Sequence, residues 1–249
     1  MNSALLGLLF AAVALIYASV GFGGGSSYAA LLVLAGVSYR LIPSISLVCN
    51  IVVVAGNCMN YFKSGDLNWR LYLLPTIFSV PMAYLGGRIN VSETVFLFLL
   101  CTTLTITGIR LLLKFREYSE DGTYKPLSPF LAGTSGAVLG FVAGITGIGG
   151  GIFLSPIMHY FRAGSPKQIA ATASFFILVN SISGLIGQLQ KNALNHDLFA
   201  FWYLPLVVII GGQIGNRVAI KIIPQKYIAL ITAALVLFVA AQLAMKLLQ

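Results

Sequence analysis

Two glycine-rich runs are the residues of this sequence whose type and spacing best suit a chemical role. Gly147-Ile148-Gly149-Gly150-Gly151 holds four glycines in five residues, and Gly21-Phe22-Gly23-Gly24-Gly25 repeats the spacing 126 residues upstream. Each glycine disfavours a helix interior by about 1 kcal/mol relative to alanine, so each run predicts a break in an apolar segment. A helix that restarts after a break has free N–H groups and a partial positive charge, which bind anions.

Hydroxyl groups follow only the first of these runs. Ser26 and Ser27 add donors at the start of the helix that follows it. Ile152 and Phe153 hold the corresponding positions after the second run, so we expect the backbone to supply most of the donors there. Two such helix starts that face each other from opposite sides would bind an anion without a buried arginine.

Polar side chains in the third apolar run of each half are further candidates. Ser46 and Ser174 coincide in the repeat, and a buried amide such as that of Asn50 needs a hydrogen-bond partner. The alternative interpretation is that the glycines only let helices pack closely and that the polar groups only join helices. The predicted substrate site comprises Gly23, Gly24, Gly25, Ser26, Ser27, Ser46, Asn50, Gly149, Gly150, Gly151, Ile152, Phe153, Thr172 and Ser174.

Catalytic and metal-binding patterns are absent from the sequence. Neither glycine run completes a dinucleotide-binding or P-loop motif, and the three cysteines lack metal-ligand spacing. All six carboxylates fall at the ends of apolar runs or in loops, so none could relay protons in the middle of a span. We therefore expect no enzyme, no cofactor and no bound metal.

The composition predicts a membrane protein. Of the 249 residues 58% are apolar and only 8% are charged, against about 25% charged in soluble domains. The net charge of +9 could suggest a nucleic-acid partner, but the basic residues lie in short connections between apolar runs. We expect membrane lipids and a small anion as partners, and no nucleic acid.

The apolar runs repeat in the same order in both halves. They occur at about 4–20, 26–37, 41–62, 71–87 and 94–113, and again at about 130–146, 152–161, 168–189, 198–219 and 227–248. The second run of each half is too short to span a bilayer comfortably. We predict an all-α polytopic membrane protein with two inverted repeats, each a glycine-broken helical hairpin, spanning or re-entrant, plus three transmembrane helices.

The distribution of Lys and Arg predicts the orientation of the chain. If the first two runs of each half go there and back, the fifteen basic residues divide eleven to four between the two sides. Four crossings per half would divide them eight to seven, so the positive-inside rule favours the first arrangement. We predict a first repeat at 1–113, a cytoplasmic linker at 114–129, a second repeat at 130–249 and an N-terminus outside.

Two segments carry a family resemblance: Gly144-Ile145-Thr146-Gly147-Ile148-Gly149-Gly150-Gly151-Ile152-Phe153-Leu154-Ser155-Pro156 and Ala170-Ala171-Thr172-Ala173-Ser174. In them the chain resembles the sulfite exporter TauE/SafE family, and the likeness extends over almost the whole length. The first half departs from the pattern, because it lacks a proline equivalent to Pro156. The resemblance implies a multi-pass protein of the plasma membrane, the inner membrane of a bacterium, that transports a small sulfur-containing anion such as sulfite, thiosulfate or an organosulfonate.

Inverted, glycine-interrupted repeats are typical of secondary transporters that work by alternating access around a site near the middle of the bilayer. Two alternatives remain open, an anion channel and a membrane-embedded scaffold subunit of a larger complex. The direction of transport, the coupling ion and the formation of a homo-oligomer are also open at this stage.

Overall fold

The computed structural model of the protein describes residues 2–19, 21–113, 124–191, 196–218 and 225–247. Within these ranges the chain forms ten α-helices and one 3₁₀-helix, and no strand. The all-helical class predicted from the sequence is confirmed. Most of the predicted linker, residues 114–123, lies outside the described ranges.

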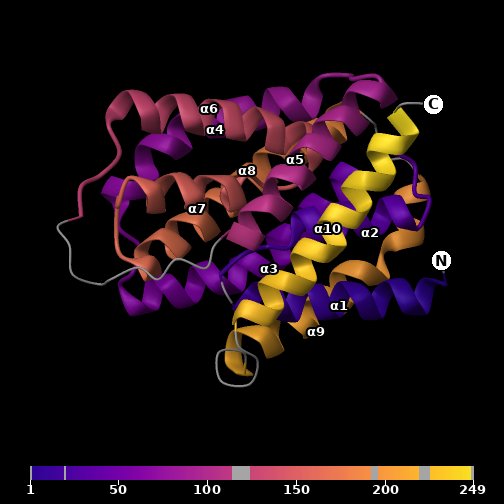
Figure 1. Ribbon diagram of the computed structural model, residues 1–249, viewed down its shortest axis with the longest axis horizontal. Coiled ribbons are helices and arrows are strands. Elements are labelled where there is room, and N and C mark those ends of the chain that lie inside the picture. Colours follow the sequence, from indigo (N-terminus) through magenta and orange to yellow (C-terminus); the bar gives the residue numbers. More distant parts are fainter. Residues whose placement is uncertain (1, 20, 114–123, 192–195, 219–224, 248–249) are drawn as a thin grey trace.

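Each half begins with a long helix, continues with a short one and ends with three longer ones (Figure 1). The first half consists of α1 (Ser3–Ser19), α2 (Gly25–Leu34), α3 (Ile42–Ser64), α4 (Trp69–Arg88) and α5 (Glu93–Leu113). The second half consists of α6 (Pro129–Thr146), α7 (Gly151–Tyr160), α8 (Pro166–Lys191), the 3₁₀-helix η1 (His196–Phe201), α9 (Tyr203–Val218) and α10 (Gln225–Leu247).

The fourth run of the second half differs from the prediction. The sequence predicts one helix over 198–219, but the structure divides this run into η1 and α9. Pro205 favours the division, because proline has no N–H to donate and fits the first turn of a helix better than its interior. Since α9 begins at Tyr203, Pro205 falls within that first turn.

Glycines in the left-handed region separate the helices at both breaks. Gly24 and Gly150 directly precede α2 and α7, with φ of 84° and 75°. Side chains with a Cβ rarely adopt this conformation, so these two positions require glycine. Each of the two helices that follow has ten residues, about 15 Å, which is half of a bilayer core of about 30 Å.

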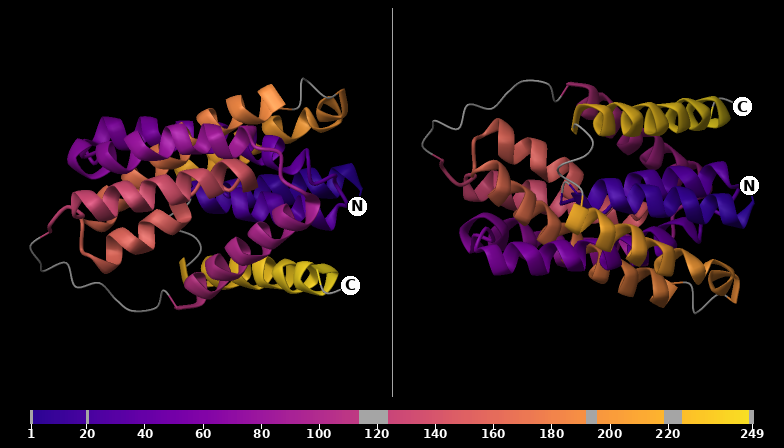
Figure 2. Two further views of the ribbon diagram at one scale, coloured as in Figure 1. Left: turned by 90° about the horizontal axis from the view of Figure 1, so that it is seen from above. Right: turned by 90° about the horizontal axis from the view of Figure 1, so that it is seen from below.

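The two broken hairpins lie at opposite ends of the long axis of the molecule. α1 and α2 lie toward the end where both chain termini are found, and α6 and α7 lie toward the other end (Figures 1 and 2). The breaks of the two hairpins meet between these ends, because a Cβ on Gly25 would lie 2.7 Å from the carbonyl oxygen of Ile148.

Helices of the two halves interlock. α4 packs against α6 and α8, α1 against α9, α5 against α10, and α3 against α8. The fourth helix of each half therefore lies against the first helix of the other half. Glycines allow this close packing, since a Cβ on Gly144 of α6 would overlap the carbonyl oxygen of Ala83 in α4. Gly211 of α9 has the same relation to Ala11 of α1.

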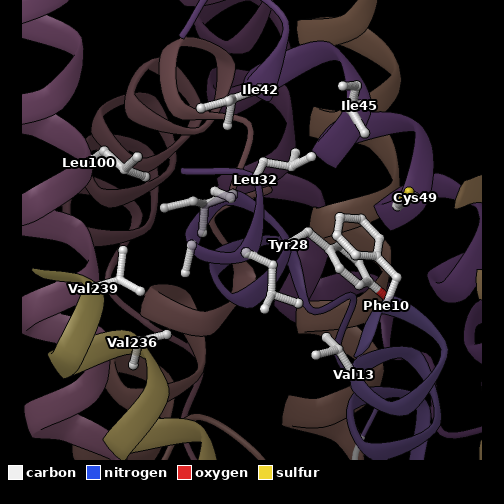
Figure 3. Packing of buried hydrophobic residues seen from close by; sticks show 14 of the residues in the cluster. Phe10, Val13, Tyr28, Leu32, Ile42, Ile45, Cys49, Leu100, Val236 and Val239 are labelled. Atoms are coloured by element: carbon white, nitrogen blue, oxygen red, sulfur yellow. The ribbon is translucent and has the colours of Figure 1, made fainter. Parts of the chain in front are cut away.

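The buried apolar side chains form two separate clusters. The larger joins α1, α2, α3, α5, α9 and α10, and within it the rings of Phe10 and Tyr28 stack with their centroids 4.7 Å apart (Figure 3). The smaller cluster joins α4, α7 and α8 through Leu71, Leu154, Met158, Ala163, Ile169 and Phe176. The core is thus divided into two clusters, and each cluster contains helices from both halves of the chain.

Several helices are suited to cross a membrane. Ile42–Ser64, Pro129–Thr146, Pro166–Lys191 and Leu198–Gly215 are long and apolar enough to span one. Large apolar side chains point outward from the bundle, for example Phe98, Phe130 and Ile210, which are 59%, 81% and 61% exposed. A water-exposed protein would bury such side chains, whereas a lipid bilayer accommodates them.

Candidate functional site

The two glycine breaks form one continuous buried region in the middle of the fold. Gly25 opens α2, and Ile148 lies in the break before α7. Their close approach leaves no room for a side chain at position 25. Residues of the two runs are therefore neighbours in space although 126 positions separate the runs in the sequence. The predicted convergence of the runs agrees with this arrangement.

Asn50 of α3 lies between the two breaks. Its Nδ2 donates a hydrogen bond to the carbonyl oxygen of Gly147 at 3.2 Å. A Cβ on Gly23 would lie 2.5 Å from Asn50 Oδ1, and a Cβ on Gly149 would lie 3.1 Å from its Nδ2. One carboxamide from the first half thus contacts the breaks of both halves, and Asn50 is fully buried.

Ser174 of α8 makes the reciprocal contact. Its hydroxyl donates to the carbonyl oxygen of Gly21, in the break of the first half. Each break is therefore held by a side chain from the third helix of the opposite half. The Ser46 hydroxyl does not mirror this bond, because Asn50, one turn further along α3, occupies the position of contact.

The starts of both short helices expose unpaired backbone donors. The first hydrogen bond of α2 runs from Tyr28 N to Gly24 O at 2.9 Å, so the amides of Gly25, Ser26 and Ser27 have no acceptor within the described chain. In α7, Gly151 N donates to Gly149 O at 3.0 Å, and Phe153 N and Leu154 N donate to Gly150 O at 3.1 and 3.2 Å, so only the amide of Ile152 has no acceptor in the described part of the chain. Both starts carry the partial positive charge of a helix N-terminus, roughly half an elementary charge each.

Of the two short helices, only α2 has hydroxyl groups in its own first turn, as the sequence predicts. The Tyr17 hydroxyl lies 3.4 Å from Ser26 Oγ and 3.1 Å from Ser27 Oγ, and both serines are 1% exposed. At the start of α7, Ile152 and Phe153 are half-buried and apolar. The expectation that the backbone supplies the donors there stays a prediction.

The structure leaves several buried polar groups without a protein partner. The hydroxyls of Ser46 and Thr172 and the Oδ1 of Asn50 are among them, within the part of the chain that is described. A buried polar atom without a hydrogen bond is destabilising by about 1–3 kcal/mol. Most of these groups lie on α3 and α8, and two of them, Asn50 Oδ1 and Ser181 Oγ, lie beside the breaks.

Sequence reasoning missed Ser181. Its side chain is fully buried, and its Oγ lies 3.3 Å from the position that a Cβ on Gly149 would take. The only sequence signal was a serine in the middle of a long apolar run. That signal could not identify the neighbour that the serine faces, because the same run carries other polar residues such as Asn180 and Ser183.

The fold and the site together define a class: a helical membrane protein in which two interrupted helices meet in the interior. Comparison with known proteins makes the assignment specific. The sequence model of the family Sulfite exporter TauE/SafE matches residues 5–243, so the chain belongs to that family. The resemblance seen in the sequence is confirmed.

Curated relatives carry names of the same kind. The probable membrane transporter protein y4hK of Sinorhizobium fredii is 33% identical over 235 residues, which cover 93% of this chain and 94% of that protein. The probable membrane transporter protein MJ0441 of Methanocaldococcus jannaschii is 24% identical over 174 residues, 66% of this chain and 64% of that protein. No solved structure matches the chain. The protein is a member of a membrane transporter family.

Proposed function

We propose that this protein is a secondary transporter that carries a small sulfur-containing anion, such as sulfite, thiosulfate or an organosulfonate, by alternating access. The observation that carries the proposal is the meeting of the two glycine breaks around Asn50. There the three free amides at the start of α2, and the free amide of Ile152 at the positively charged start of α7, would bind the oxygens of the anion from both sides. The family supplies the substrate class.

The burial of this region supports an alternating-access mechanism. Ser26, Ser27 and Asn50 are at most 1% exposed, so the halves must move before an anion can reach them. The two separate apolar clusters suggest the bodies that move, one around α4, α7 and α8 with α6 packed closely on α4, and one around α1, α2, α3, α5, α9 and α10. The opposed hairpins support an inverted repeat, in which each body would open the site to one side of the membrane (Figure 1).

The membrane potential favours export. A potential of 100 mV, negative inside, contributes about 2.3 kcal/mol per elementary charge to the expulsion of an anion. Import of the same anion would need a coupling ion. We therefore propose efflux as the direction in which transport needs no further energy source.

Flux measurements on the purified protein test the function. The protein is reconstituted into liposomes, and the movement of sulfite, thiosulfate and sulfoacetate is followed with and without the same anion on the opposite side. A transporter shows saturation and counterflow, whereas a channel shows neither. A scaffold subunit moves no anion unaided, and that result would sink the proposal.

Gly25→Ala tests the site itself. The added methyl would lie 2.5 Å from Asn50 Nδ2 and 2.7 Å from Ile148 O, directly between the two breaks. We expect loss of at least about 90% of the flux, because a displacement of about 1 Å at a binding site can lower a rate a hundredfold. Gly212→Ala is the control, since the nearest atom to its Cβ is 3.7 Å away. Equal flux in both variants would contradict the assignment of the site.

A further inference from the structure

The two helix starts differ in the hydroxyl groups that their own residues offer. In the first half, Ser26 and Ser27 stand in the first turn of α2. By the repeat spacing of 126 residues, their counterparts in α7 are Ile152 and Phe153, which carry no donor. The start of α7 therefore lacks hydroxyl groups of its own.

Ser181 of α8 brings a hydroxyl to this place from a neighbouring helix. A Cβ on Gly149, just before α7, would lie 3.3 Å from Ser181 Oγ and 3.1 Å from Asn50 Nδ2. The serine hydroxyl and the carboxamide thus both lie beside the same glycine. This position corresponds in chemistry, though not in sequence, to the serines of α2.

The surroundings of Ser181 give its hydroxyl no structural task. The side chain is fully buried, and Oγ has no hydrogen-bond partner in the described part of the chain. A serine inside a helix commonly bonds the carbonyl one turn earlier, and Ser181 does not. An unpaired hydroxyl that lies against a helix N-terminus is arranged to donate to an anion.

We propose that Ser181 is the hydroxyl donor of the second half and contacts the transported anion. The proposal rests on the proposed function and adds a residue that sets affinity. Asn50 and Ser181 then bind the anion together with the Ile152 amide at the start of α7, as Ser26 and Ser27 would with the amides of α2. The site holds hydroxyl donors on both sides although the two halves supply them from different helices.

Ser183 offers a matched control on the same helix. Its Oγ donates to the carbonyl oxygen of Val80 in α4 at 2.6 Å, so its hydroxyl is engaged on another face of α8. Ser183→Ala removes a structural hydrogen bond and should lower the melting temperature without changing anion affinity. Ser181→Ala removes an unpaired hydroxyl and should leave the melting temperature of the anion-free protein unchanged or raise it.

Thermal-shift titrations of the detergent-solubilised full chain with sulfite, thiosulfate and sulfoacetate test the inference. We expect Ser181→Ala to need about tenfold more of the stabilising anion than the wild type, the effect of one hydrogen bond to a charged group. Ser183→Ala should titrate like the wild type. The double variant Ser181→Ala, Ile152→Ser returns a hydroxyl to the start of α7 and should recover part of the lost affinity.

The outcomes separate the inference from the function on which it rests. If the wild type and Ser181→Ala titrate alike, or if Ile152→Ser recovers nothing, Ser181 is not the donor, and the transporter proposal stands. If none of the three anions stabilises the wild type, the inference and the proposed function fall together.

Discussion

At the scale of the residue, Asn50 connects the two halves of the molecule. Its Nδ2 satisfies the carbonyl oxygen of Gly147 in the second break, while its Oδ1 faces Gly23 in the first. Asparagine fits this position because it carries a donor and an acceptor on one short side chain. A shift of either break would therefore displace the Asn50 side chain and, through it, the other break.

Asn50→Ala tests this connection against Asn57→Ala on the same helix. Both changes remove a buried carboxamide, but only Asn50 makes a hydrogen bond, since Asn57 Nδ2 has no partner. We expect Asn50→Ala to be less stable than Asn57→Ala by about 1–3 kcal/mol, because Gly147 O is left unpaired. Melting curves in detergent measure the difference, and equal melting temperatures would show that the bond contributes nothing.

At the scale of the element, the packing of α4 depends on glycine. The face of α6 toward α4 carries Gly136, Gly140 and Gly144, and at each a Cβ would overlap a carbonyl oxygen of α4. Small residues at such an interface bring helix backbones together, and in lipid this packing replaces the hydrophobic effect as a source of stability. This packing holds α4, the fourth helix of the first half, against helices of the second half.

Gly144→Ala tests this packing. The new methyl would overlap Ala83 O and lie 2.8 Å from Gly87 N, so α4 must shift away. Overpacking of this kind destabilises by about 1–3 kcal/mol. Gly7→Ala in α1 is the control, because the nearest atom to its Cβ would be a Tyr203 ring carbon at 3.5 Å, an ordinary contact distance. The thermal stability of the control should equal or exceed that of the wild type, and a similar loss in both variants would argue against the interface.

At the scale of the whole molecule, the two halves contain their helices in the same order but begin at opposite ends of the long axis (Figure 2). The N-terminus lies at one end, together with the C-terminus, and α6 begins at the other (Figure 2). If the long axis crosses the bilayer, Ser3 and Ser128 face opposite compartments. From the positive-inside rule we predict that the start of α6 lies in the cytoplasm and the N-terminus outside.

Labelling with a membrane-impermeant thiol reagent tests this orientation. Ser3→Cys and Ser128→Cys are made in a chain in which Cys49, Cys58 and Cys101 are replaced by alanine. In intact cells the reagent should modify the cysteine at position 3 and should modify that at position 128 only after the membrane is opened. Modification of both in intact cells would contradict the opposed hairpins, and the reverse pattern would contradict the charge argument alone.

The amino-acid sequence by itself determined the membrane class, the duplication, the family and the positions of the two breaks. These features rest on local properties: the length of apolar runs, the fixed spacing of the glycines and the conformational freedom of glycine at Gly24 and Gly150. The division of 198–219 into two helices also had a local cause, Pro205. Its effect depended on the residue at which α9 begins, because that residue decides whether the proline falls in the first turn.

Only the tertiary structure decided which side chains meet at the breaks. Several polar side chains of α8 are buried, Ser181 and Ser183 among them, and the sequence of the helix does not show which neighbouring helix each of them faces. The exchange of fourth helices between the halves was hidden for the same reason. Contacts between Asn50 and Gly147, 97 residues apart, follow from the packing of whole helices, and no local pattern in the chain encodes them.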